Sequence, residues 1–253
     1  MHSKEDYIAV FDSGVGGISV LKELIRLMPQ EKYLYFGDSV NAPYGDRPTA
    51  QVRQLTMEAA EMLMERGIKA LVVACNTATA AAIQDLRAAY PDSIIIGIEP
   101  ALKLAYDRYP AGRVGVMATQ VTLREEKFSH QLERFPNMQV SLIPAPGLVE
   151  LIESGKVDDP EMEELLGQLL APYVGKLDAL VLGCTHYPFV KDTVARILGP
   201  ETELLDGSQG TARHTMRRLE EAGLLHRGTG SLQIENSAND LALIQLAAKL
   251  LEK

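Results

Sequence analysis

The two cysteines of this chain stand at equivalent points of two similar segments. Cys75 follows the apolar run Leu71–Ala74, and Cys184 follows Leu180–Gly183. Each run predicts a short buried strand, and the residues after each cysteine predict the start of a helix. Ligands of open α/β sheets bind beyond the carboxyl ends of the strands, so we expect both thiols to face a ligand.

A thiol at the N-terminus of a helix is well placed to act as a base. The helix dipole and the free N–H groups favour an anion there, so a thiolate forms more easily. The pKa of an unperturbed thiol is about 8.5, and a modest downward shift makes it a usable base near neutral pH.

Other uses of cysteine fit the pattern less well. A lone cysteine more often fills a core, but two at matching positions favour a function. A zinc site would lack ligands, because the chain has no CxxC motif and two thiols with His186 leave the usual set of four incomplete. A redox disulfide lacks the usual spacing.

The segment Phe11–Gly17 is rich in glycine and follows a predicted strand. Its glycines allow a tight turn, and the helix after it offers N–H groups to a carboxylate or a phosphate. It is not a dinucleotide motif, because Ser19 stands at the third glycine position, and no lysine follows as in a P-loop. Asp12 is either a turn residue or a group that orients a nearby base.

Three further features are candidates for the site. The loop from Gly37 to Gly45 either connects two elements or closes over a substrate with backbone donors. His186 is either structural or a proton partner of Cys184. Glu153 would otherwise be an ordinary solvated helix residue.

The polar residues of these motifs are neutral hydrogen-bonding groups, with no Arg or Lys among them: Ser13, Asn76, Thr77, Thr119 and Thr185. A phosphorylated ligand would usually attract Arg or Lys. The carboxylate of a small amino acid can be held by hydroxyl and N–H groups alone.

Short apolar runs alternate with amphipathic stretches along the chain, which predicts an α/β fold with mostly parallel sheets. Predicted helices include residues 123–135 and 161–174. The pattern repeats: Cys75 lies 62 residues after Ser13, and Cys184 lies 65 after Thr119. We interpret this as an internal duplication.

The duplication predicts two similar α/β domains related by pseudo-twofold symmetry, with the active site in the cleft between them. We expect a discontinuous first domain of residues 1–97 plus 208–253 and a second domain of residues 98–207.

The composition excludes several classes of partner. The net charge of −9 argues against nucleic acid and against an anionic membrane surface. No apolar run reaches the ~20 residues that span a bilayer, and no signal peptide is visible. With only two cysteines the chain is no disulfide scaffold, so we expect it in the cytoplasm, where thiols stay reduced.

Taken together, these segments resemble the glutamate racemase family, within the aspartate/glutamate racemase superfamily. The residues that carry the resemblance run in the family's order over nearly the whole chain: Phe11–Gly17, Gly37–Asp38, Pro43–Gly45, Ala74–Ala78, Gly97–Pro100 and Gly183–Pro188.

The resemblance implies interconversion of L- and D-glutamate by two opposed thiols, with no metal, pyridoxal or nucleotide. Cys75 would take the proton from D-glutamate and Cys184 from L-glutamate. Asp12 would assist Cys75, and His186 with Glu153 would assist Cys184. Substrate contacts are expected from Asp12, Ser13, Tyr44, Gly45, Asn76, Thr77, Thr119, Thr185 and His186. The resemblance also implies a homodimer that supplies D-glutamate for peptidoglycan.

One position departs from the family pattern. Glu150 stands where the family often has proline, which places a second carboxylate near Glu153. Two other functions remain open at this stage: an aspartate racemase or related superfamily member, and an amino-acid-binding module without catalysis. Loss of one cysteine would mark the second, and both cysteines are present.

Overall fold

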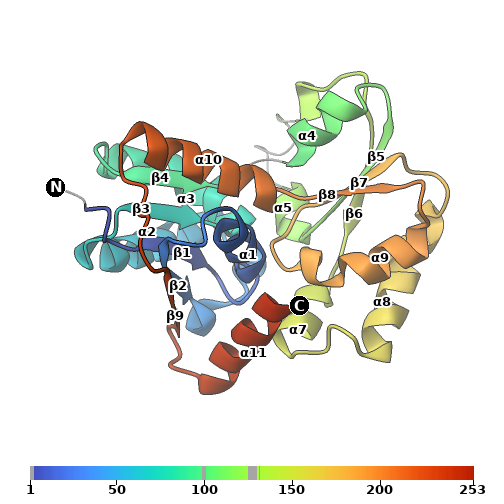
Figure 1. The fold of residues 1–253 in the computed structure, drawn as a ribbon. Coiled ribbons are helices and arrows are strands. Elements are labelled where there is room, and N and C mark those ends of the chain that lie inside the picture. The colour runs from blue at the N-terminus through green and yellow to red at the C-terminus, as the bar shows by residue number, and fades with distance from the viewer. Residues whose placement is uncertain (1–2, 99–100, 125–129, 131) are drawn as a thin grey trace. The chain divides into compact units, whose positions relative to one another are not determined.

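Two parallel sheets carry the fold (Figure 1). The computed structural model describes residues 3–98, 101–124, 130 and 132–253. The chain divides into two units: unit 1 is Met1–Glu99 with Ser208–Lys253, and unit 2 is Pro100–Gly207. The two-sheet α/β architecture that the sequence predicted is confirmed.

The sheet of unit 1 has five strands in the order β4-β3-β1-β2-β9, and all neighbours are parallel. Every residue of β1, β3 and β4 is buried, as expected for strands covered on both faces. The bounds are β1 (Ile8–Asp12), β2 (Lys32–Gly37), β3 (Ala70–Val73), β4 (Ile94–Gly97) and β9 (Ser231–Asn236).

Helices cover both faces of this sheet. One core cluster joins side chains of α2 and α3 to alternate residues of β1 and β3. On the other side, α1 packs against α10 and α11. The bounds are α1 (Ile18–Leu27), α2 (Thr49–Glu65), α3 (Asn76–Ala89), α10 (Ser208–Glu221) and α11 (Leu241–Glu252), with 3₁₀ turns η1 (Ser39–Asn41) and η2 (Tyr44–Asp46).

The sheet of unit 2 has four parallel strands in the order β6-β5-β7-β8. They are β5 (Arg113–Ala118), β6 (Gln139–Pro144), β7 (Ala179–Leu182) and β8 (Glu203–Leu205). The helices are α4 (Ala101–Arg108), α5 (Gln120–Arg124), α7 (Leu148–Glu153), α8 (Pro160–Leu170) and α9 (Lys191–Leu198), with 3₁₀ turns η3 (Ala171–Tyr173) and η4 (Tyr187–Val190).

The two sheets repeat one topology. Read from β4 to β2 and from β8 to β6, four strands follow in the same order, so β3 matches β7 and β1 matches β5. Matching hydrogen bonds join the ends of these strands. The N–H of Ala74 donates to the carbonyl oxygen of Phe11 at 2.8 Å, and the N–H of Gly183 donates to the carbonyl oxygen of Met117 at 2.7 Å. These matched bonds support the duplication inferred from residue spacing.

Several helix boundaries differ from the predictions. No helix was predicted at α4, and none was delimited at α7, although Glu153 was expected to be a helix residue. These helices have eight and six residues and are too short for a clear periodicity. Helix α8 ends at Leu170, whereas a helix to Val174 was predicted, because Pro172 has no N–H to continue it. The predicted helix at 123–135 lies partly outside the described residues.

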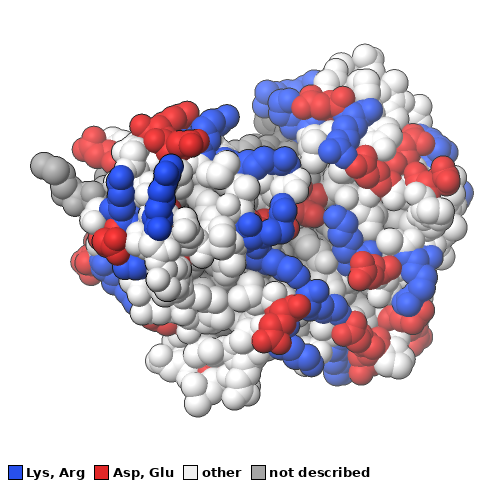
Figure 2. All heavy atoms as spheres, viewed as in Figure 1, with Lys and Arg blue, Asp and Glu red and all other residues white. Residues whose placement is uncertain are grey.

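The surface carries charges of both signs. On the face shown in Figure 2, basic and acidic side chains lie interspersed over both units. Among the residues with described placement, no helix is long and apolar enough to cross a membrane.

A buried ion pair ties together the amino-terminal ends of the strands of unit 1. Lys69 Nζ lies 2.5 Å from Glu31 Oε2, and both side chains are almost fully buried. Lys69 also donates to the carbonyl oxygens of Lys4 and Leu224, and Glu31 accepts from the N–H of His226. One ion pair therefore joins the chain before β1, the start of β2 and the segment that leads to β9.

We predict that Lys69→Met destabilises unit 1 strongly. Methionine matches the volume of lysine but leaves the Glu31 carboxylate buried without its counter-ion, which costs about 3–5 kcal/mol. Urea unfolding followed by circular dichroism measures this loss. The control is Arg53→Met, which breaks the exposed pair of Arg53 with Asp85 and should change stability little. Equal losses in the two variants would contradict the prediction.

Candidate functional site

Cys75 lies between β3 and α3, as the sequence pattern predicted. It is the N-cap residue of α3, and its Sγ accepts a hydrogen bond from the N–H of Ala78 at 3.4 Å. The thiol is buried, with 6% of the residue exposed. A helix N-terminus stabilises an anion at this position, so the local fold favours the thiolate.

Ser13 lies beside this thiol and directly follows Asp12, the last residue of β1. Ser13 Oγ is 3.6 Å from Cys75 Sγ. Asp12 is fully buried, and its Oδ1 accepts the N–H of Gly14 at 3.0 Å. A Cβ on Gly17 would lie 2.7 Å from the Cβ of Asp12, so glycine is needed there for the carboxylate to fit against the loop.

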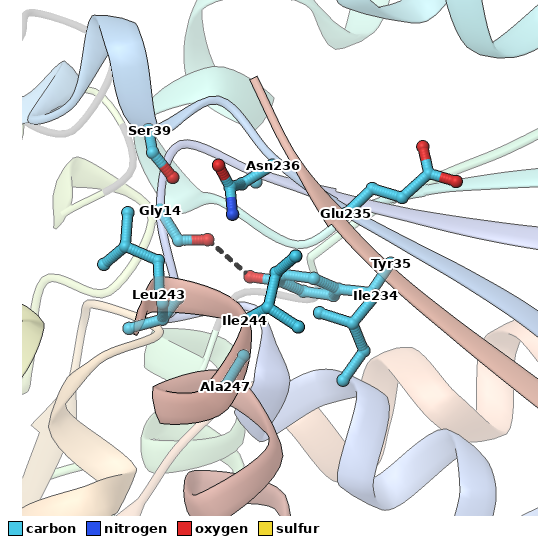
Figure 3. A pocket seen from close by; sticks show the side chains of 11 residues that line it. Gly14, Tyr35, Ser39, Ile234, Glu235, Asn236, Leu243, Ile244 and Ala247 are labelled. Atoms are coloured by element: carbon cyan, nitrogen blue, oxygen red, sulfur yellow. Dashed lines mark hydrogen bonds between the residues drawn. The ribbon is translucent and has the colours of Figure 1, made fainter. Parts of the chain in front are cut away.

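The glycine-rich loop is held from strand β2. The Tyr35 hydroxyl donates to the carbonyl oxygen of Gly14 at 2.6 Å, at the edge of a small pocket lined also by Ser39 and Asn236 (Figure 3). A Cβ on Gly37 would lie only 2.5 Å from that same carbonyl oxygen. The close packing fixes the backbone that carries Ser13.

Tyr44 belongs to the same core cluster as Cys75, but its hydroxyl is already used. It donates to Asp38 Oδ2 at 2.7 Å, and only 1% of the residue is exposed. Burial and the bond to Asp38 raise the pKa of Tyr44, and negative charge at Cys75 and Asp12 adds to the shift. Any contact of Tyr44–Gly45 with a substrate would therefore use the backbone. Asn76 and Thr77, the first residues of α3, are half-buried beside the thiol.

Cys184 follows β7, but the expectation that it opens an α-helix is wrong. The 3₁₀ turn η4 comes first, and α9 begins only at Lys191. An α-helix would need the N–H of residue 188 to donate to the carbonyl of Cys184, and Pro188 has none. The N–H of Tyr187 makes that bond instead, at 3.2 Å.

At Cys184 the imidazole of His186 lies beside the thiol, where Cys75 has a helix N-terminus. Its Nδ1 lies 3.6 Å from Cys184 Sγ, and its Nε2 lies 2.6 Å from Glu153 Oε1. The residue is buried, with 3% exposed. This order of thiol, imidazole and carboxylate can hold a thiolate beside an imidazolium that the carboxylate orients.

The charge on His186 is set by two opposing effects. Burial lowers its pKa, but the hydrogen bonds to Cys184 and Glu153 outweigh burial and hold the pKa well above the ordinary 6.5. Because the pKa is raised in the folded state, protonated His186 stabilises the fold at low pH. That contribution is lost as the pH rises through the raised pKa.

The remaining predicted residues of unit 2 differ in burial and in their hydrogen-bond partners. Thr185 is buried between Cys184 and His186. Thr119 directly follows β5, and its hydroxyl accepts the N–H of Thr122 at 3.3 Å, as a helix cap does. Of the two neighbouring carboxylates, Glu153 pairs with His186, whereas Glu150 is exposed.

Asp38 belongs to the Gly37–Asp38 motif but was not among the predicted site residues. It is buried, accepts the bond from Tyr44, and also accepts both hydrogen bonds of the Asn41 amide, at 3.0 and 3.1 Å. The same rule that selected Asp12 could have found it, because Asp38 directly follows β2, the neighbour of β1.

The structure thus brings the predicted residues together in two sets. Asp12, Ser13, Tyr44, Gly45, Asn76 and Thr77 lie with Cys75 in unit 1, and Glu153, Thr185 and His186 lie with Cys184 in unit 2. Within the described residues, no group of three or more His, Cys, Asp or Glu side chains is arranged to hold a metal ion.

Comparison with known proteins gives one consistent result. A family profile described as Asp/Glu/hydantoin racemase matches residues 15–215. A glutamate racemase of Clostridium kluyveri is 47% identical over 100% of both chains. A glutamate racemase structure from Bacillus anthracis superposes with a TM-score of 0.88 and 31% identity, covering 99% of this chain and 95% of that one. Another, from Francisella tularensis in complex with D-glutamate, gives 0.86 and 28% at the same coverage.

We predict that Glu153→Gln lowers the pKa of His186, because glutamine can still accept a hydrogen bond from Nε2 but lacks the negative charge that favours the imidazolium. Titration of the imidazole signals by NMR measures the change, and His186→Gln identifies the signals among the five histidines. Glu150→Gln is the matched control, one turn earlier on α7 and not bonded to His186. A fall in the pKa as large in Glu150→Gln would refute the assignment of Glu153.

Proposed function

The chain belongs to the Asp/Glu/hydantoin racemase family, and from this premise we propose that it interconverts L- and D-glutamate without a cofactor. The identity to a curated glutamate racemase over the full length supports glutamate as the substrate. The observation that carries the mechanism is the pair of thiols, Cys75 and Cys184, at matching strand ends of two units with one topology.

Racemisation needs a base on one face of the α-carbon and an acid on the other. The α-proton of an amino acid is a very weak acid, so each thiol must work with groups that support its charge. One ionised and one protonated cysteine meet this need, and their roles reverse with the handedness of the substrate. We propose that both thiols act on one bound glutamate, from opposite faces of its α-carbon.

The helpers differ between the two thiols. Cys75 would take the proton from D-glutamate, with Asp12 as its helper and the N-terminus of α3 stabilising the thiolate. Cys184 would take the proton from L-glutamate, with His186 as its proton partner and Glu153 fixing the imidazole. The raised pKa of His186 fits this role, since an imidazolium stabilises the neighbouring thiolate.

The carbanion formed at the α-carbon is stabilised through the substrate carboxylate. Preorganised donors aimed at a developing negative charge are worth more in a buried site than in water. Ser13, Asn76, Thr77 and Thr185 supply neutral donors of this kind, together with His186, Thr119 and the backbone of Tyr44–Gly45. We propose these groups as the substrate contacts.

We further propose the cellular setting that the family implies. The enzyme would work in the cytoplasm, where its thiols stay reduced, and would supply D-glutamate for peptidoglycan. It would act as a homodimer, and light scattering on the purified protein measures its mass.

Deuterium uptake from solvent tests the function directly. Purified protein incubated with L-glutamate in D₂O, without added cofactor, should replace the α-proton and produce both enantiomers, as followed by NMR and polarimetry. The same assay with L-aspartate separates an aspartate racemase. A protein that binds glutamate without exchanging the α-proton would be a binding module and would overturn the proposal.

We predict that Cys75→Ser and Cys184→Ser each lower racemisation by about 10³-fold or more, because a serine hydroxyl replaces a base that must ionise. Since the two enantiomers have equal free energies, kcat/KM must fall equally in both directions. Residual α-proton exchange separates the roles: it should be confined to L-glutamate in Cys75→Ser and to D-glutamate in Cys184→Ser.

Circular dichroism spectra of both variants should match the unmodified protein, so that lost activity is not lost folding. Racemisation by Cys184→Ser at a rate near that of the unmodified chain would refute the two-base mechanism.

A further inference from the structure

Two buried tyrosines of strand β2 donate hydrogen bonds to the backbone on either side of helix α1. Tyr33 and Tyr35 lie two residues apart, so their side chains point to the same face of the sheet. The Tyr33 hydroxyl donates to the carbonyl oxygens of Leu24 and Met28, both at 2.9 Å, where α1 ends. The Tyr35 hydroxyl donates to the carbonyl oxygen of Gly14 at 2.6 Å. Its bond therefore holds the loop that leads from β1 to α1.

Gly14 is held at both of its backbone polar groups. Its N–H donates to Asp12 Oδ1 at 3.0 Å, and its carbonyl oxygen accepts the hydrogen bond of Tyr35 (Figure 3). The residue is buried, and a buried carbonyl oxygen requires a donor, which Tyr35 supplies. Because glycine is the most flexible residue of the backbone, bonds at both groups are needed to fix the course of the chain there.

Ser13 directly precedes Gly14 and depends on the same stretch of backbone. Its Oγ lies 3.6 Å from Cys75 Sγ, and 7% of the residue is exposed. This contact joins the loop after β1 to the N-terminus of α3, so it exists only while the loop keeps its place. A hydroxyl beside a thiolate donates to the sulfur, and such a bond weakens steeply when the donor moves away. The course of the chain at Gly14 therefore affects how well Cys75 holds a negative charge.

We propose that Tyr35 is a positioning residue for the first thiol: by holding the Gly14 carbonyl, it keeps the Ser13 hydroxyl within reach of Cys75 Sγ. Tyr35 acts through Gly14 and Ser13 and is not a catalytic residue. The proposal rests on the proposed function in one respect, that Cys75 acts as a base. It adds to the site a residue of β2, which neither the cysteine motifs nor the glycine-rich loop contains.

NMR titration of a single cysteine tests this role without measuring racemisation. The chain has two cysteines, so a Cys184→Ser variant labelled with ¹³C at the cysteine β-carbon gives one signal, that of Cys75. The chemical shift of this carbon follows ionisation of the thiol. Adding Tyr35→Phe should raise the pKa of Cys75 by about one unit, a tenfold lower ratio of thiolate to thiol, because the hydroxyl that supports the thiolate is displaced.

A double-mutant cycle tests whether the effect of Tyr35 passes through Ser13. In the same background, Ser13→Ala removes the hydroxyl and should itself raise the pKa of Cys75. Combining Ser13→Ala with Tyr35→Phe should give no further shift, because the donor that Tyr35 positions is already gone.

Tyr33→Phe in the Cys184→Ser background is the matched control. It removes a buried hydroxyl from the same strand and the same face, but one that holds the other end of α1. Tyr33→Phe and Tyr35→Phe should both lower the melting temperature, by about 2–4 °C, since each loses a buried hydrogen bond. The titration of Cys75 should move in Tyr35→Phe and stay unchanged in Tyr33→Phe.

A titration of Cys75 in Tyr35→Phe that coincides with the background would overturn the proposal. So would an equal shift in Tyr33→Phe, which would report a general loosening of unit 1, or a further shift when Tyr35→Phe is added to Ser13→Ala. An unchanged titration in Ser13→Ala alone would also overturn it, and this variant can be measured even if Tyr35→Phe does not fold. None of these titrations involves turnover, so the deuterium uptake of the unmodified chain tests the proposed function separately.

Discussion

Negative charge on sulfur must be stabilised in a partly buried site, and much of the local structure around both cysteines meets that requirement. Unit 1 uses backbone: the N-terminus of α3 directs the N–H of Ala78 to Cys75, and Ser13 adds a hydroxyl. Unit 2 uses side chains: His186 contacts Cys184, and Glu153 holds His186. Two copies of one topology thus solve the same electrostatic problem differently.

A single proline accounts for much of that difference. Pro188 removes the N–H that would bond to the carbonyl of Cys184, so the chain makes a 3₁₀ turn where its counterpart makes an α-helix. His186 lies two residues after Cys184, and the turn brings its ring into contact with the thiol. A thiol at a helix N-terminus would not need this contact. Pro188 therefore has two effects at Cys184. The thiol lacks the stabilisation of a helix N-terminus, and it gains the contact with an imidazole.

The positions of the residues around the thiols depend on close packing as much as on charge. Asp12 fits because residue 17 has no Cβ, and the Gly14 carbonyl is held between Tyr35 and Gly37. Asp38 holds the following loop through Tyr44 and Asn41. At the opposite end of the sheet, the ion pair of Lys69 with Glu31 joins three segments that are distant in sequence. Groups held in place by such packing need little reorganisation when charge develops.

The sequence by itself determined the alternation of strands and helices, the place of both cysteines at strand ends, and the repeat that relates them. These features follow from local hydrophobic pattern and spacing, which a linear chain displays directly. Tertiary structure decided which side chains meet. It paired His186 with Glu153 and not with Glu150, assigned the Tyr44 hydroxyl to Asp38, and left the Tyr187 hydroxyl without a partner among the residues that the structure describes. Contacts between elements depend on packing geometry that no local pattern records, so sequence alone could name the candidates but not their partners.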